Sequence, residues 1–248
     1  MPRLLASVTT WANRVLVYDT GSTDGTQELC RSHGCEVVEC EWEGTYRHRA
    51  RCVAACAESR WILLLDADEI VEPQLVDAIR EVVAQDDPRV NGYAIRRTVH
   101  FEGAWLRHTF QPEFRIRFVR GGKARVVGSG ASGRGTHERV EVNGPVPRLR
   151  GTLRHESWAD LNDFWNRCPR YCAEAAQFGE RGGNAADVFL RPALVFVKQY
   201  VLKHGFLDGR RGFLMAAMMA TGNLMKQITL LRRRWNRQIE DSRDDSCG

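Results

Sequence analysis

The chain has 248 residues, of which 43% are hydrophobic and 27% charged, and its net charge is +5 at pH 7. This length and composition suit one compact α/β domain with room for a smaller appendage, and they exclude disorder as the default state. No uncharged apolar run approaches the roughly 20 residues that a helix needs to cross a bilayer. We therefore do not expect an integral membrane protein.

Eight cysteines could suggest a metal centre or a disulfide framework, but their spacing favours neither. Cys52/Cys56 and Cys168/Cys172 lie four residues apart within predicted helices, and no C-x-x-C is present. No signal peptide precedes them. We expect reduced thiols in a cytoplasmic protein.

The first 85 residues alternate between predicted strands and helices. The predicted strands are residues 15–18, 36–39 and 61–65. The predicted helices begin near Asp24, cover about residues 46–58, and begin at Pro73. Ser22 or Thr23 is expected to cap the first of them. The continuous apolar run at 61–65 is typical of a buried parallel strand, so the alternation predicts a parallel sheet of doubly wound type.

The pattern changes after residue 90. Four further strands are predicted, at residues 93–99, 114–118, 137–142 and 149–153. Gly121–Gly135 is rich in Gly, Ser and Arg and is predicted to be a mobile loop. The chain is predicted to be helical from Trp158 onward, with a break at Gly205–Gly209. We expect two parts, residues 1–157 and 158–248.

Two carboxylate motifs follow predicted strands of the first part. In Asp19-Thr-Gly-Ser-Thr-Asp24-Gly25, a carboxylate stands at the carboxyl end of a strand, where open α/β sheets bind ligands. In Asp66-Ala-Asp68-Glu69, three carboxylates in four residues follow five apolar residues and repel one another unless a cation or a hydrogen-bonding ligand compensates. Hard oxygen donors suit Mg²⁺ or Mn²⁺, and such a metal stabilises a departing diphosphate. The alternatives are an ordinary strand–turn–helix junction and a solvated acidic turn.

Together these motifs resemble the family-2 glycosyltransferases. VLVYDTGSTDGT is similar to that family's nucleotide-binding segment, and WILLLDADE is similar to its D-x-D motif. The resemblance continues in order through GYAIRR, PEFRIRFVR, THERVEV, LRGTLRHESW and GFLDGRRG, and so covers nearly the whole chain. It implies a GT-A fold, which is Rossmann-like with a mostly parallel sheet, here followed by C-terminal helices. The pattern is similar to the branch that adds glucose to the lipopolysaccharide inner core through a β-1,4 linkage.

The resemblance also implies roles for single residues. Asp19 would contact the uracil or ribose, Asp66 the ribose, and Asp24 belongs to the same substrate-binding segment. Asp68 would hold the metal on the diphosphate, with His155 completing the metal sphere and Arg117 steadying the diphosphate. An inverting transfer needs a base to take the acceptor proton; Glu138 is our choice and Glu113 the rival.

The sequence departs from the family pattern in two places. Members normally begin with a further β-strand that forms one wall of the nucleotide pocket, whereas Met1–Val8 corresponds to the helix after that strand. This predicts either a truncated chain or poor nucleotide affinity. Ala50-Arg51 stands where the family has a basic residue followed by Asn.

The last third combines apolar residues with Lys and Arg from Val188 onward. Basic and aromatic residues together suit a helix in the headgroup region of an anionic membrane; the alternative is a helical pair packed on the catalytic domain, and both can hold. No helix-turn-helix, zinc finger or RNA-binding signature is present, so nucleic acid is not an expected partner.

The sequence therefore predicts an inverting, metal-dependent hexosyltransferase that uses UDP-glucose and a lipid-linked lipopolysaccharide-core acceptor. We expect it at the cytoplasmic face of the inner membrane. Two other functions stay open: a transferase with a peptide, polysaccharide or polyprenyl-phosphate acceptor, and a catalytically impaired homologue that acts only in binding.

Overall fold

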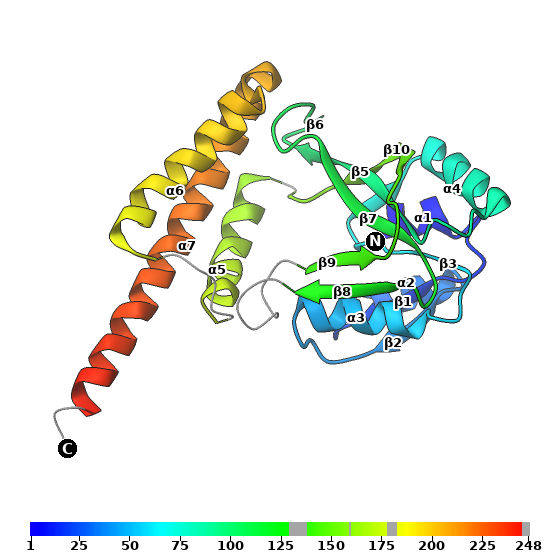
Figure 1. The fold of residues 1–248 in the computed structure, drawn as a ribbon, viewed down its shortest axis with the longest axis horizontal. Helices are drawn as coiled ribbons and strands as arrows, with labels where there is room; N and C mark the ends of the chain where they lie inside the picture. The colour runs from blue at the N-terminus through cyan, green and yellow to red at the C-terminus, as the bar shows by residue number, and fades with distance from the viewer. Residues whose placement is uncertain (129–137, 159, 178–182, 245–248) are drawn as a thin grey trace. The chain divides into compact units, whose positions relative to one another are not determined.

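The computed structural model describes residues 1–128, 138–158, 160–177 and 183–244. They form two compact units (Figure 1). The first unit contains Met1–Val99, Pro112–Val127 and the segment that ends at Ser157. The second contains His100–Gln111 and the chain from Trp158 onward.

The first unit opens with a small parallel layer. Strands β1 (Leu16–Asp19) and β2 (Glu36–Glu39) pair in parallel, from Leu16 beside Glu36 to Asp19 beside Glu39. Helices α1 (Pro2–Val8) and α2 (Thr26–Ser32) contribute Leu5 and Cys30 to the core beneath them. The predicted strands at 15–18 and 36–39 and their parallel pairing are confirmed.

Helix α2 begins two residues later than predicted. Its N-cap is Gly25, which has φ +81° and no side chain that could cap the helix. Ser22 does not cap the helix because its hydroxyl donates to Asp19 instead, at 2.6 Å. The predicted cap at Ser22 or Thr23 is therefore wrong.

A larger mixed sheet forms the centre of the first unit. Its strand order is β3-β7-β5-β10-β4. The strands are β3 (Trp61–Leu63), β4 (Glu69–Val71), β5 (Gly92–Phe101), β7 (Glu113–Arg120) and β10 (Arg148–His155). Among these described strands, only β5 and β10 are parallel neighbours; β3/β7, β7/β5 and β10/β4 are antiparallel.

The expectation of a mostly parallel sheet is thus wrong for these strands, although the α/β class is confirmed. The apolar run that contains β3 identified a buried strand correctly. Such a run carries no information about the direction of its neighbour, and that neighbour is β7, which runs back antiparallel to β5.

Helices cover this sheet as the periodicity predicted. Helix α4 (Pro73–Gln85) packs Leu75, Ile79 and Val82 into a core with Ile95 of β5 and Leu153 of β10. Helix α3 (Thr45–Ala55) buries Val53 in a second core with Ile62 and Val119. The strands on either side of the D-x-D loop are therefore held by packed cores.

Part of the predicted loop 121–135 is a strand. Residues Ala124–Gly128 form β8, which pairs with β9 (Glu138–Val142). Val126 packs against the core that contains Val140, so the Gly- and Arg-rich composition hid a pairing strand. Residues 129–135 of that predicted loop lie outside the described residues.

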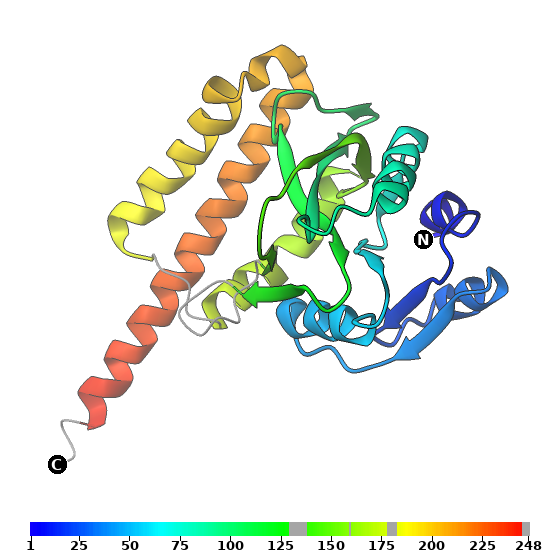
Figure 2. The same ribbon diagram turned by 45° about the vertical axis from the view of Figure 1, so that its right-hand side comes forward.

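The second unit is mainly helical, as predicted from Trp158 onward. It contains α5 (Leu161–Gln177), α6 (Ala185–Val197), a short π-helix η1 (Lys198–Leu202), a 3-10 turn η2 (Gly205–Asp208) and α7 (Gly209–Asp244). The predicted break at Gly205–Gly209 is confirmed. Helices α6 and α7 lie side by side in both views (Figures 1 and 2). In this unit β6 (Ala104–Trp105) pairs with the end of β5.

The seven cysteines within the described residues are free thiols. Cys168 and Cys172 are buried on one face of α5, with their sulfur atoms 4.0 Å apart. The expectation of unpaired cysteines is confirmed for these seven; the eighth, Cys247, lies outside the described residues.

Candidate active site

The Asp66–Glu69 segment is a tight loop closed by its own hydrogen bonds. It follows β3 and leads directly into β4. The Glu69 carboxylate accepts the backbone N–H of Asp66 at 2.9 Å, and the Asp66 carbonyl accepts the N–H of Glu69 at 3.0 Å. This reciprocal pair fixes the direction of the Asp66 and Asp68 side chains relative to the sheet.

Arginines compensate the first carboxylate of the motif. Arg117 of β7 donates from Nη2 to Oδ2 of Asp66 at 2.6 Å and to Oε1 of Glu69 at 3.3 Å. Arg49 of α3 donates to the other Asp66 oxygen. Nη1 of Arg97, on β5, lies 3.5 Å from Oε1 of Glu69. Guanidinium groups of the protein itself thus compensate Asp66 and Glu69.

Burial strengthens the interactions among the charges of this network. Burial by itself would raise the pKa of Asp66, but the charges of Arg117 and Arg49 outweigh it and hold that pKa well below its ordinary value. Burial raises the pKa of Glu69, which is fully enclosed, against the lowering effect of Arg117. Burial would lower the pKa of Arg117, yet Glu69 and Asp66 raise it. Asp66, Glu69 and Arg117 therefore form one ion-pair network that supports the loop. We call these three residues the buttress.

Asp68 is the carboxylate of the motif that lies outside this buttress. Its Oδ2 lies 3.3 Å from Nε2 of His155, and its side chain is 38% exposed. His155 ends β10, and its register beside Glu69 on β4 brings it to the motif. The Ser157 hydroxyl contacts Nδ1 of His155 and so orients the ring. Asp68 and His155, predicted to share a metal, are brought together.

This pair fits the predicted metal chemistry. Mg²⁺ and Mn²⁺ commonly bind through one or two protein groups together with substrate phosphates and water. A carboxylate oxygen and an imidazole nitrogen within 3.3 Å, with the second ring nitrogen oriented by a hydroxyl, match that pattern. Within the described part of the chain, no group of three or more His, Cys, Asp or Glu side chains could hold a metal without such outside ligands.

The two candidate bases lie in different environments. Both oxygens of Glu113 accept from Arg97, at 2.9 and 3.0 Å, and one also accepts from Arg115. Burial would raise the pKa of Glu113, but these arginines outweigh it and lower the pKa. Among the described residues Glu138 accepts one arginine hydrogen bond, from Arg49 at 3.4 Å. Within the described residues, Glu138 thus accepts fewer arginine hydrogen bonds than Glu113.

The Asp19 carboxylate organises its own turn. It accepts hydrogen bonds from the N–H groups of Gly21 and Ser22 at 3.0 and 2.8 Å, from the Ser22 hydroxyl, and from the Gln27 amide at 2.8 Å. Burial would raise its pKa, yet these donors lower it to about 2. Asp24 is exposed and accepts the N–H of Thr26 at 3.1 Å, beside the start of α2. Within the described residues, no hydrogen bond or ion pair joins Asp19 or Asp24 to the Asp66 network.

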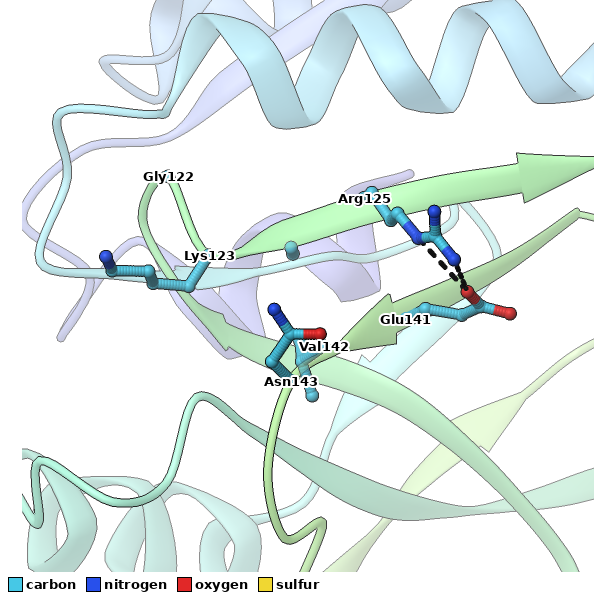
Figure 3. Close-up of a pocket in the computed structure, with 7 residues that line it drawn as sticks. Gly122, Lys123, Arg125, Glu141, Val142 and Asn143 are labelled. Carbon is cyan, nitrogen blue, oxygen red and sulfur yellow. Dashed lines mark hydrogen bonds and ion pairs between the residues drawn. The ribbon is translucent and has the colours of Figure 1, made fainter.

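A surface pocket lies elsewhere in the first unit (Figure 3). It is lined by residues of the β7–β8 turn, of β8, and of β9 and the residue after it, namely Gly122, Lys123, Ala124, Arg125, Glu141, Val142 and Asn143. Arg125 and Glu141 point toward one another and pair at 2.7 Å. None of the predicted site residues lines this pocket, so we do not assign the active site to it.

Three residues that shape the site, Arg49, Arg97 and Ser157, were not among the predicted site residues. Each had a signal in the sequence. Arg49 falls within a predicted helix, and Arg97 within the predicted strand 93–99, where it is largely buried beside Glu113. Ser157 lies two residues after the predicted ligand His155. A buried arginine needs a carboxylate partner. An arginine inside the predicted strand 93–99 therefore indicated an ion pair with a nearby acidic residue, and Glu113 is that partner.

The sequence model of glycosyl transferase family 2 matches residues 1–135. Among curated proteins, an uncharacterized glycosyltransferase of Rickettsia prowazekii is 23% identical over 238 residues, which is 92% of this chain and 81% of that protein. An uncharacterized glycosyltransferase of Rickettsia typhi is 24% identical over 239 residues, again 92% and 81%. The lipopolysaccharide core biosynthesis glycosyltransferase LpsC of Rhizobium meliloti is 26% identical over 147 residues, 57% of this chain and 53% of LpsC.

The family match covers more than half of the chain and includes both carboxylate motifs. Its members have the GT-A fold, to which the α/β architecture and the helices that follow it correspond. The chain belongs to glycosyl transferase family 2 and is a glycosyltransferase that takes a nucleotide-sugar donor and an acceptor.

Proposed function

We propose that this protein is an inverting hexosyltransferase that moves glucose from UDP-glucose onto a lipid-linked saccharide of the lipopolysaccharide core. The observation that carries the proposal is the Asp68–His155 pair, 3.3 Å apart at the end of the arginine-buttressed loop. The similarity to LpsC supports the choice of acceptor. A lipid-linked acceptor implies peripheral contact with an anionic membrane, at the cytoplasmic face of the inner membrane.

The residues of the two carboxylate motifs and His155 have different roles in the proposed transfer. Asp68 and His155 would hold Mg²⁺ or Mn²⁺ at the diphosphate. The positive charge of the metal would stabilise the negative charge that develops on the departing UDP oxygen. Asp66 is locked by Arg117 and Arg49, so it keeps the loop in place and presents Asp68. Asp19 and Asp24 belong to the segment that would contact the nucleoside.

The bond changes balance without a covalent intermediate. The acceptor oxygen attacks the anomeric carbon of glucose while the bond from that carbon to the UDP oxygen breaks, so configuration inverts. Glu138 takes the proton of the acceptor hydroxyl, and UDP leaves with the electron pair of the broken bond. Arg49 contacts both Asp66 and Glu138 and so fixes the base relative to the loop.

The test is transfer and UDP release with Asp68→Asn, measured with UDP-glucose and a core oligosaccharide across a Mn²⁺ titration. Asp68→Asn should lower turnover by roughly 10²-fold or more and weaken UDP binding that depends on Mn²⁺. Asp77→Asn is the matched control, because Asp77 is an exposed carboxylate on α4 paired only loosely with Arg80, at 3.8 Å. Unchanged Mn²⁺-dependent transfer by Asp68→Asn would show the site assignment to be wrong.

A further inference from the structure

Helix α6 has its apolar residues on the outside. Phe189, Leu190 and Leu194 stand at spacings of one and four residues, on one helical face, and are 61–76% exposed. A helix that packs on a protein normally turns such a face inward. Within α6 no residue is fully buried, so this outer face does not contribute to the core of the second unit.

The inner face of the same segment already has its packing partners. The ring of Phe196 lies 5.8 Å from that of Phe213 on α7, and the ring of Tyr200 lies 5.7 Å from it. These edge-on contacts attach α6 and η1 to α7. The outward-facing Phe189, Leu190 and Leu194 therefore take no part in these ring contacts that hold α6 and η1 against α7.

Further large apolar side chains are exposed in the short segments between α6 and α7. Leu202 of η1 is 69% exposed, and Phe206 and Leu207 of η2 are 46% and 60% exposed. This turn is anchored by Asp208, whose carboxylate accepts the backbone N–H groups of Arg107, His108 and Thr109 at 2.8–3.0 Å. The hydrogen bonds of Asp208 therefore fix the backbone of the turn that carries Phe206 and Leu207. We call the surface made by Phe189, Leu190, Leu194, Leu202, Phe206 and Leu207 the apolar face.

The charges around the apolar face are mostly positive. Residues 185–214 contain Arg191, Lys198, Lys203, Arg210 and Arg211 against Asp187 and Asp208. Both carboxylates are engaged within the unit, Asp187 with Arg191 at 2.6 Å and Asp208 with the 107–109 loop. The segment that carries the apolar face therefore combines exposed apolar side chains with an excess of positive charge.

This combination fits an anionic bilayer better than a second copy of the chain. A two-fold contact through the apolar face would set the same cations against one another. An anionic lipid surface attracts those cations while it receives the leucines and phenylalanines. Among the described residues, no helix is long and apolar enough to cross a bilayer.

We propose that the apolar face of α6, η1 and η2 is the surface through which this protein lies on an anionic membrane. The assignment deepens the membrane contact of the proposed function and rests on it. It places lipid contact on residues 189–207, and it leaves the arginine-rich end of α7 outside the primary contact.

The test is co-sedimentation of the full chain with vesicles of phosphatidylcholine alone and with a quarter phosphatidylglycerol. The combined variant Phe189→Ser, Leu194→Ser and Leu202→Ser removes exposed apolar groups only, so its circular dichroism and unfolding midpoint should match the wild type. Its partition onto anionic vesicles should fall about tenfold or more. Trp235→Ser with Ile239→Ser, at exposed apolar positions near the end of α7, should bind like the wild type.

Three outcomes would overturn the assignment. Equal binding by the combined variant would overturn it while leaving the proposed membrane contact standing. A wild type that binds neither vesicle would overturn the membrane contact and the assignment together. A wild type that is dimeric without lipid, and that the combined variant makes monomeric, would show that the apolar face joins two copies.

Discussion

Nη2 of Arg117 lies 2.6 Å from Oδ2 of Asp66, although Arg117 stands in β7 and Asp66 follows β3. The same nitrogen reaches Glu69 at 3.3 Å. Arg117 was expected to steady the diphosphate of the donor; here its guanidinium is committed to the loop that presents Asp68. Asp66 is thus bound by arginines, whereas Asp68 lies 3.3 Å from His155.

Arg117→Met should therefore destabilise the fold strongly. The substitution leaves Glu69 fully buried and deprives both Glu69 and Asp66 of their closest shared cation. Breaking such a buried pair costs about 3–5 kcal/mol. Urea unfolding should report this loss. Arg125→Met is the control, because Arg125 pairs with Glu141 on the surface and should cost under about 1 kcal/mol. Equal losses would contradict the buttress.

Asp19→Asn should remove a pH-dependent part of the stability. Hydrogen bonds from Ser22, Gln27 and Gly21 lower the folded pKa of Asp19 to about 2, from an ordinary value of 3.8. A lowered carboxyl pKa stabilises the folded state above the unfolded pKa, and that stabilisation is lost as pH falls from about 4 toward 2. The wild type should exceed the variant by about 1–2 kcal/mol at pH 7.

The two unfolding curves should then converge at low pH. Measurements of unfolding midpoints at pH 7, 5 and 3 would follow the difference between the wild type and Asp19→Asn. A difference that persists unchanged at pH 3 would mean that the hydrogen-bond geometry of the turn, and not the charge of Asp19, supplies the stability.

Local periodicity predicted the elements of the first unit well. The apolar spacing of Leu75, Ile79 and Val82 located the buried face of α4, and the alternation at 93–99 located β5. Pairing partners were not predictable in the same way. The side chains of residues 61–65 are apolar whether the neighbouring strand runs parallel or antiparallel, so nothing local to β3 indicated β7 beside it.

The site was predictable in its carboxylates and not in its cations. Asp66 and Asp68 follow an apolar strand, and that contrast is visible along the chain. Arg49, Arg97 and Arg117 come from three separate elements and meet only in the folded protein. The helix cap at Ser22 failed for a related reason, because a hydroxyl that can cap a helix can equally bond to a nearby carboxylate, here that of Asp19.

Ser157→Ala should weaken metal binding more than it weakens the fold. The hydroxyl contacts Nδ1 of His155, and loss of a partner that orients a metal-ligating histidine typically costs 10–100-fold in affinity. The Mn²⁺ concentration that gives half-maximal transfer should rise by about that factor, with turnover at saturating Mn²⁺ close to the wild type. Ser59→Ala, in the turn before β3, is the control. An unchanged Mn²⁺ requirement would remove His155 from the metal site.

Mutation can distinguish the two candidate bases, because both carboxylate oxygens of Glu113 already accept hydrogen bonds from arginines. Glu113 is bound through both oxygens by Arg97, so Glu113→Gln should lower stability by about 2–4 kcal/mol, because it leaves a largely buried guanidinium short of its partner. Its effect on turnover, measured below the new unfolding transition, should be small. Glu138 has a single arginine hydrogen bond at 3.4 Å among the described residues, so Glu138→Gln should fold normally.

Turnover is where Glu138→Gln should differ. Loss of a general base typically lowers turnover by about 10²–10⁴-fold, while UDP binding, measured by calorimetry with Mn²⁺, should stay within a few fold. Because Gln cannot accept a proton, the acidic limb of the pH–rate profile should also flatten in this variant and persist in Glu113→Gln. The reverse pattern, a flat profile in Glu113→Gln and near-normal turnover in Glu138→Gln, would move the base to β7 and require Arg97 to release Glu113 during the reaction.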